Sequence, residues 1–295
     1  MLSYVATIGL SLTHAGWAIF GNTQVGPILT AKFGWSVEEE KLYLSLIGNI
    51  SILGLGIGSI FGGFFIAKGR RLAIFYMSVF IYVGVGLTLI RTIPTIMVGR
   101  GLCGFAAGVF NMINAKCIFE SVPAKYAGIM GCSTNINMVL FGLICSLLGM
   151  SLPADATQMP FDQMWRLVYG FPLIFMTLQL LLCLVPFKAE PIDFCIQKGD
   201  DAGAMFMIEK VFRPKDKTED KSKIFTQYLL LRKTELQSGS QGGSISVMKS
   251  MFGSEYWRAT WVCAGLGLCG QLCAIGPTVV FSTTIVKKIE TESKG

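Results

Sequence analysis

Residues 99–128 read GRGLCGFAAGVFNMINAKCIFESVPAKYAG, an apolar run that is followed by a short polar break and the start of another apolar run. The first run extends over about Thr95–Phe119, and about 20 mostly apolar residues suffice for a helix to cross the hydrocarbon core of a bilayer. Gly104 and Gly108 share one face of that helix, where small residues let a neighbouring helix approach closely. The stretch therefore predicts a membrane-spanning helix that packs against another helix.

Windows of similar length and apolarity recur along the rest of the chain. The composition is 52% hydrophobic and 15% charged, whereas soluble domains carry about 25% charged residues. Such a chain has too few polar residues to cover a soluble domain, so a lipid bilayer is the predicted surrounding. We expect an all-α, polytopic helical membrane protein whose other spans cover approximately Tyr4–Lys32, Leu42–Ala67, Leu72–Ile90, Gly128–Ser151, Trp165–Phe187 and Trp257–Val286.

Glycines and prolines mark particular positions within these spans. A close helix contact is predicted in the second span, where glycines recur every four residues at Gly54, Gly58 and Gly62. Local breaks are predicted in the first and last spans at Gly26-Pro27 and Gly276-Pro277. No basic segment precedes the first span and no clear cleavage site follows it, so we expect it to be retained rather than removed as a signal peptide.

The connectors between the spans carry most of the charge. Twelve Lys and Arg residues fall between Lys188 and Arg258, and the formal net charge is +7. Because membrane proteins concentrate Lys and Arg in cytoplasmic loops, we place the N-terminus and the connectors 68–71, 120–127 and 188–256 on the cytoplasm-like side. No basic stripe alternates with aromatic residues, which argues against nucleic acid as a partner. The predicted parts are a six-helix bundle over 1–187, a hydrophilic connector over 188–256, a seventh helix over 257–286 and a polar tail over 287–295.

The long connector contains two helical patterns of its own. The stretch Asp200–Phe212 and the stretch Ile224–Leu236 both place apolar residues at helical spacing. We expect two short amphipathic helices on the inner face of the membrane, with a flexible Ser/Gly-rich link over 238–246. The predicted apolar positions are Ala204, Met207, Ile208 and Val211 in the first helix and Ile224, Tyr228 and Leu231 in the second.

Residue types that serve catalysis or metal binding are sparse. The nine cysteines are scattered mostly through apolar runs without a CxxC pair, and His14 is the single histidine. We interpret the cysteines as small apolar helix residues and His14 as a helix-contact residue rather than a proton relay. The sequence has no nucleophile–base pair, metal-ligand spacing or phosphate-binding loop, so it predicts no enzyme, no metal site and no cofactor.

Two stretches resemble a known superfamily of membrane carriers. Residues 62–71, GGFFIAKGRR, resemble the G-x-x-x-D-x-x-G-R-R loop that joins the second and third spans of the major facilitator superfamily, with Ile66 at the acidic position. Residues 99–128 resemble the sugar-porter signature G-R-x-x-x-G-x-x-x-G and the E-x-x-P-x-x-x-R-G that follows it, with Ala127 at the last arginine. The matching positions are Gly62, Gly69, Arg70, Arg71, Gly99, Arg100, Gly104, Gly108, Glu120, Pro123 and Gly128.

Looser similarity covers the ends of the chain. Residues 270–283, GQLCAIGPTVVFST, resemble the seventh-span motif of the family, with Gly270 and Gly276 in place of a glutamine and an asparagine. Phe20-Gly21-Asn22-Thr23 is similar to a first-span motif, and Glu190-Pro191 follows the sixth span as in a looser P-E-S-P-R motif. The resemblance implies a six-helix half bundle of this superfamily with a seventh span, and facilitated transport of a hexose, a polyol or a similar polar solute.

The resemblance also implies which amides contact the solute. Asn135 and Gln271 fall at family positions for substrate contact, and Asn22 is a weaker candidate. Amide side chains suit a sugar because they donate and accept hydrogen bonds at once. The alternative for each of them is a hydrogen bond between helices with no ligand.

The charged motif residues have different expected roles. Glu120 is expected to form an inner-face charge cluster with Arg70 and Arg71, whereas Arg100 is expected to extend its side chain to the outer interface. A proton symporter of this family would need an acid in the first span near Asn22, and the sequence has none there. Facilitated diffusion is therefore favoured over proton coupling.

The resemblance reaches only the seventh span, whereas rocking-type carriers enclose a midplane site between two halves. Three interpretations stay open. The chain is a carrier portion whose second half comes from a partner chain, or a carrier-derived accessory or structural subunit that does not transport, or a truncated gene product.

Overall fold

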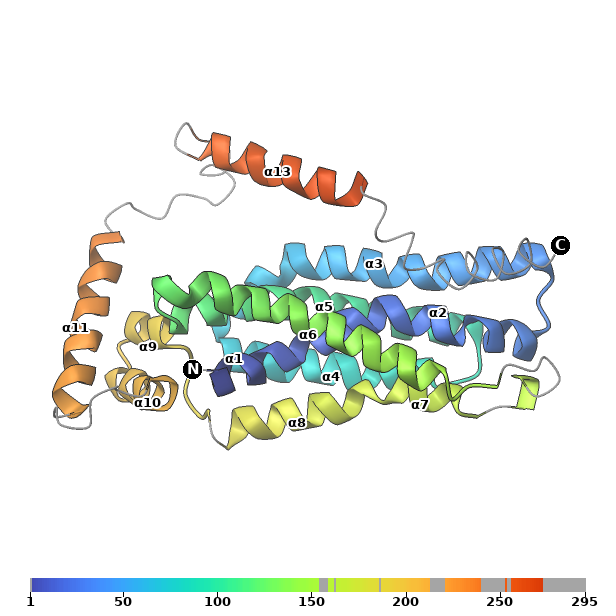
Figure 1. The fold of residues 1–295 in the computed structure, drawn as a ribbon, viewed down its shortest axis with the longest axis horizontal. Coiled ribbons are helices and arrows are strands. Elements are labelled where there is room, and N and C mark those ends of the chain that lie inside the picture. The colour runs from blue at the N-terminus through green and yellow to red at the C-terminus, as the bar shows by residue number, and fades with distance from the viewer. Residues whose placement is uncertain are drawn as a thin grey trace. The chain divides into compact units, whose positions relative to one another are not determined.

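The computed structural model describes residues 2–153, 159–161, 163–185, 187–212, 221–239, 253 and 256–272. It divides into two units, Met1–Phe225 and Thr226–Gly295. The described residues are helical and include no strand (Figure 1). The predicted all-α fold class is confirmed.

The first predicted span is a helical path that changes its hydrogen bonding partway along. It consists of α1 (Leu2–Gly9), the 3₁₀ turn η1 (Leu10–Leu12) and α2 (Thr13–Phe33). The prediction of a break at Gly26-Pro27 was wrong, because Pro27 lies inside α2 and the irregularity is at η1. Contacts of α2 with α3, α5 and α6 hold it in place, and neighbouring helices commonly make proline tolerable within a membrane span.

The next predicted spans are long helices close to their expected bounds. They are α3 (Val37–Lys68), α4 (Arg70–Thr88), α5 (Ile93–Ser121), α6 (Ala124–Gly149) and the pair α7 (Trp165–Gly170) and α8 (Pro172–Leu184). Among the described residues, five segments are long and apolar enough to cross a membrane: 37–68, 70–88, 93–121, 125–149 and 165–184. The first predicted span is not one of the five. The seventh appears as α13 (Trp257–Leu272), and residues 273–286 of that prediction lie outside the described residues.

Helices α3 and α5 form the closest helix pair of the bundle. A Cβ added at Gly58 of α3 would lie 2.0 Å from the carbonyl oxygen of Phe105, and one at Gly104 of α5 would lie 2.1 Å from that of Ser51. Gly54, Gly62 and Gly108 also meet the partner helix closely. The glycines of both spans therefore allow backbone-to-backbone packing.

Two short helices lie at the end of the bundle where α1 begins (Figure 1). Helix α9 (Ile192–Lys198) was not predicted, and α10 (Asp201–Val211) begins where the Asp200 carboxylate accepts a hydrogen bond from the Gly203 N–H at 2.9 Å. Because α10 packs against α9 and α1, protein covers its apolar face, in place of the membrane surface that we expected. The buried residues of α10 are the predicted Ala204, Met207, Ile208 and Val211.

Helix α11 (Lys221–Gly239) contains the second predicted amphipathic stretch but buries other positions. Phe225 and Leu229 are buried, whereas Leu231 is 59% exposed and Tyr228 is only partly covered. The predicted helix is present, and the predicted apolar stripe was wrong in its register. The predicted flexible link over 238–246 lies largely outside the described residues.

Candidate functional site

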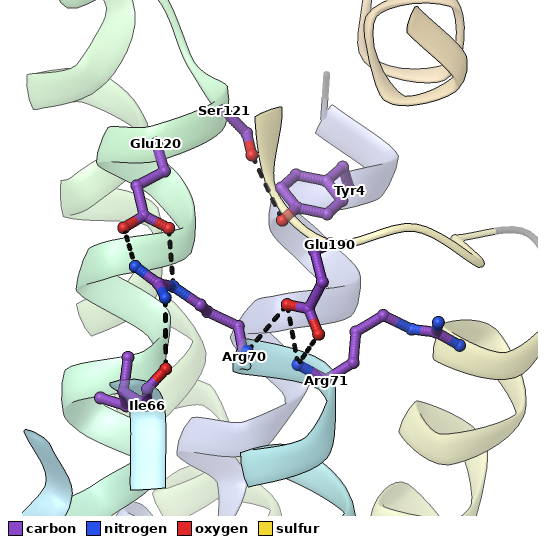
Figure 2. A network of polar contacts seen from close by, with 7 residues as sticks. All are labelled: Tyr4, Ile66, Arg70, Arg71, Glu120, Ser121 and Glu190. Atoms are coloured by element: carbon purple, nitrogen blue, oxygen red, sulfur yellow. Dashed lines mark hydrogen bonds and ion pairs between the residues drawn. The ribbon is translucent and has the colours of Figure 1, made fainter. Parts of the chain in front are cut away.

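The end of the bundle where α3 meets α4 holds a charge cluster around Arg70, which is the first residue of α4 (Figure 2). Its guanidinium forms a two-pronged ion pair with Glu120 of α5, with Nε donating to Oε2 at 2.9 Å and Nη2 donating to Oε1. Nη1 donates to the carbonyl oxygen of Ile66 at 3.2 Å, and the group lies 4.2 Å from the ring centre of Phe194. Every nitrogen of this nearly buried guanidinium therefore has an acceptor.

Glu190 is a further member of this cluster, with a role that the sequence did not predict. Its carboxylate accepts hydrogen bonds from the backbone N–H groups of Arg70 at 2.8 Å and of Arg71 at 3.1 and 3.2 Å (Figure 2). These N–H groups belong to the first turn of α4, where a helix has unpaired donors and a partial positive charge. Glu190 thus caps α4 from the segment that follows α8. The available signal was the resemblance of Glu190-Pro191 to the P-E-S-P-R motif that follows the sixth span.

Gly69 makes room for this cap. It joins α3 to α4 with φ of 150°, a conformation that side chains with a Cβ rarely adopt. A Cβ at this position would also lie 3.0 Å from Oε1 of Glu190. The glycine of the loop motif is therefore required by both the backbone and the bound carboxylate.

Arg71 does not join Arg70 on Glu120. Its Nη1 donates to the carbonyl oxygen of Lys188, and its Nη2 donates to that of Cys183 at 3.2 Å. These carbonyls lie at and just beyond the end of α8, where a helix has unpaired acceptors. Of the expected cluster of Arg70, Arg71 and Glu120, the structure thus contains the Arg70–Glu120 pair. Arg71 instead contacts the end of α8.

The segment after Glu190 is packed tightly against the cluster. The Cys195 thiol, in α9 and outside the membrane spans, donates to the carbonyl oxygen of Glu190 at 3.3 Å. Burial raises the pKa of this thiol to about 11, and the charges of Asp200 and Glu190 act in the same direction. The thiol is therefore protonated at neutral pH and serves as a packing group.

Arg100 lies inside the bundle, so the expectation that it reaches the outer interface was wrong. Its side chain has no exposed surface. Nη2 donates to the carbonyl oxygen of Ala18, and the guanidinium lies 4.8 Å from the ring centre of Trp17 and 5.6 Å from that of Tyr169. Position 100 is inside α5 on the face that meets α2 and α7, so aromatic faces surround the charge.

Asn22 lies next to this arginine pocket and uses its amide between helices. Its Oδ1 accepts a hydrogen bond from the Tyr169 hydroxyl at 3.2 Å, and its Nδ2 donates to the carbonyl oxygen of Leu44 at 3.4 Å. The residue is 7% exposed. The amide therefore links α2 to α3 and α7. This is the alternative that the sequence left open, a hydrogen bond between helices with no ligand.

The other two substrate candidates are in different situations. Asn135 is exposed on α6. The backbone of Gln271 lies in α13, and its side chain is outside the described residues. The structure therefore brings no two of the three amide candidates together.

The remaining signature residues shape the packing. Gly99 faces α4, where an added Cβ would lie 2.5 Å from the carbonyl oxygen of Gly84, and Gly104 and Gly108 face α3. Pro123 precedes the first residue of α6, whereas a Cβ at Gly128 would meet nothing within 4 Å. Most of the fourth-span signature thus permits close contacts of α5 with its neighbours.

Comparison with known proteins matches the chain to sugar carriers. The family model described as sugar (and other) transporter matches residues 2–294. Hexose transporter 1 of Plasmodium knowlesi is 25% identical over 264 residues, which are 85% of this chain and 51% of that protein. Plastidic glucose transporter 4 of Arabidopsis thaliana is 27% identical over 262 residues, which are 87% of this chain and 44% of that protein.

Solved structures share the fold. The inward-open structure of the xylose transporter XylE from E. coli superimposes with a TM-score of 0.68 at 18% identity, covering 96% of this chain and 64% of that one. The chain spans about half the length of the curated relatives named here. On the match over residues 2–294, the chain belongs to the sugar (and other) transporter family and has the fold of the major facilitator superfamily.

Proposed function

We propose that this chain moves a hexose, a polyol or a similar polar solute by facilitated diffusion, as the first helical bundle of a sugar porter. The family match over residues 2–294 is the observation that carries the proposal. Relatives that are named hexose and glucose transporters support the class of solute. The absence of an acid near Asn22 in the first span supports diffusion without a coupled proton.

Asn135 is the proposed solute contact of this bundle. It is a polar, exposed residue on α6. Only 19% of the most apolar, membrane-length stretch of that helix is buried inside the protein. The corresponding apolar stretch of α3 is also largely uncovered, with 28% of it buried, whereas 61% of that of α5 is buried. We assign the uncovered faces of α3 and α6 to contact with a second bundle, which lies either in the same polypeptide or in a partner chain, because a rocking carrier encloses its solute between two bundles.

Orientation is part of the same proposal. The inner charge cluster, α9 and α10 are placed on the cytoplasm-like side together with the N-terminus. Glu120 and Glu190 would then fasten α4, α5 and the segment after α8 at the cytoplasmic end.

Uptake by the purified chain tests transport directly. The full chain is reconstituted in liposomes, and entry of radiolabelled glucose, xylose and myo-inositol is measured with and without a proton ionophore. If a second copy of the chain supplies the second bundle in the liposome, we expect saturable uptake of at least one of them that the ionophore does not change. Folded, reconstituted protein that takes up none of the three would contradict transport by this chain alone.

A matched pair of variants tests the site. Asn135→Ala removes the proposed contact, and Gln197→Ala removes an exposed amide of α9, which lies outside the uncovered faces of α3 and α6. Loss of one solute hydrogen bond is worth about tenfold in KM, so we expect that increase for Asn135→Ala and an unchanged KM for Gln197→Ala. Equal KM values in the two variants would remove Asn135 from the site.

A non-transporting role as a subunit of a membrane complex is the second candidate. Ile66 favours it, because this buried residue stands where the loop motif has an acid. At this position Arg70 therefore meets only a backbone carbonyl and no carboxylate. Purification of the native protein in mild detergent separates the candidates. A constant ratio to other membrane proteins supports the subunit role, and a chain that purifies alone with transport activity argues against it.

A further inference from the structure

Four polar side chains in the interior of the bundle are buried without a hydrogen-bond partner among the described residues. They belong to Thr13, His14, Asn114 and Gln179. Thr13 is 2% exposed, Asn114 is 1% exposed, and His14 and Gln179 have no exposed surface. None of their polar side-chain atoms has a hydrogen-bond partner among the described residues. Buried polar groups in native proteins are nearly always hydrogen-bonded, so each of these needs a partner of some kind.

Contacts on either side place Asn114 level with η1. The Ser121 hydroxyl of α5 donates to the Tyr4 hydroxyl at 3.4 Å, and farther along the His14 ring stacks on Phe110 at 6.0 Å. Helix α5 therefore runs antiparallel to the first span, and all helices rise by the same amount per residue. Asn114 lies between Phe110 and Ser121, so it falls between the levels of His14 and Tyr4. Direct contacts between α5 and η1 agree with this level.

A similar argument places Gln179 of α8 at that level. The Trp17 indole donates to the carbonyl oxygen of Val168 at 3.0 Å, and the ring of Tyr4 lies 5.2 Å from that of Phe187. Gln179 is buried on α8 between these two contacts, and α8 also touches η1. Two buried amides from different helices, both without a hydrogen-bond partner among the described residues, thus lie at the level of the turn that interrupts the first span.

Thr13 and His14, which directly follow the turn in the chain, are the other two of these four residues. Thr13 is the first residue of α2 after η1, and its backbone N–H donates to the carbonyl oxygen of Leu10. The 3₁₀ turn replaces α-helical hydrogen bonds by tighter ones of poorer geometry. A polar environment is therefore concentrated where the backbone of the first span is least regular.

We propose that Thr13, His14, Asn114 and Gln179 form a buried water-binding site at the η1 turn. A buried water molecule typically makes about three hydrogen bonds to otherwise unpaired polar groups, and these side chains supply both donors and acceptors. A hydrated turn lets the first span bend there without leaving a buried amide unpaired. This site lies inside one bundle and does not depend on the proposed solute site at Asn135.

The single histidine provides a direct test. His14 is the only histidine of the 295-residue chain, so 15N-histidine labelling of the full chain, purified through a tag without histidine, gives an imidazole spectrum from this site alone. In lipid nanodiscs we expect a cross-peak between the water resonance and an imidazole N–H proton. A spectrum without this cross-peak, under conditions where the imidazole signal itself is resolved, would overturn the proposal.

Apolar replacements give a second readout that does not involve transport. Asn114→Leu combined with Gln179→Met removes the amides at similar volume, and we expect loss of the water cross-peak and a lower apparent Tm. Asn49→Leu, at an exposed amide of α3, is the control and should change neither. A higher Tm for the double variant would mean that the amides are dry and unpaired in the native protein, which would also overturn the proposal.

Discussion

Arg70 and Glu120 form a nearly buried ion pair, with side chains only 7% and 12% exposed. A buried pair contributes little net stability when it is intact, because both charges lose their hydration. Removing one partner is costly, since the other charge is left in a poorly solvated place. The effect of a substitution at this pair therefore differs from that of a surface acid.

We predict that Glu120→Ala destabilises the protein by about 3–5 kcal/mol. Arg70 would keep only the Ile66 carbonyl and the Phe194 ring as partners of its side chain. Thermal unfolding of the purified chain in detergent checks this, with Glu209→Ala of α10 as the control because Glu209 is exposed. Similar Tm values for the two variants would show that the ion pair does not hold α4 to α5.

At the scale of the element, the crossing of α3 and α5 depends on the absence of side chains. Gly56 and Gly58 are both in α3, but a Cβ at Gly56 would meet nothing within 4 Å, whereas one at Gly58 would collide with the backbone of α5. Backbone cannot move aside as a flexible side chain can. A substitution at Gly56 therefore tests only the helix propensity of the new residue, whereas a substitution at Gly58 also tests the packing of α3 against α5.

We predict opposite effects for the same substitution at these two positions. Gly58→Ala should destabilise the protein by about 1–3 kcal/mol through overpacking. Gly56→Ala should stabilise it by about 0.5–1 kcal/mol, because alanine loses less conformational entropy in a helix than glycine. Apparent Tm values of both variants in the same detergent measure the difference. An equal shift in the same direction would contradict the close crossing.

At the scale of the whole molecule, the unit Met1–Phe225 has two chemically different ends. One end carries the charge cluster with α9 and α10, and the other carries the turn between α2 and α3, where Ser36 and Glu39 cap α3 reciprocally. The proposed orientation puts the first end in the cytoplasm. Residues at these two ends should therefore react from opposite sides of a membrane.

We predict that a membrane-impermeant maleimide distinguishes the two ends. In a cysteine-free version of the full chain, Val37→Cys at the start of α3 should react in intact cells, because Val37 is 69% exposed. Glu209→Cys on α10 should react only after the cells are permeabilised. The reverse pattern would invert the proposed orientation, and equal reaction of both in intact cells would contradict a spanning bundle.

The sequence alone determined the helical spans, the packing glycines and the apolar stripe of α10. These follow from apolar length and from spacing within one helix, which are local properties. Motif spacing also placed Arg70 and Glu120 in one expected cluster, although they come from different helices. Asn135 and Gln271 stay predictions.

Only the tertiary structure decided how distant segments meet. It placed the irregular turn at Leu10–Leu12, buried Arg100 among aromatic rings, and brought Glu190 to the N–H of Arg70, which lies 120 positions away in the chain. It also buried the apolar stripe of α10 against protein. A local pattern reports which surface a helix must cover, but the partner that covers it is set by packing between segments that are far apart in sequence.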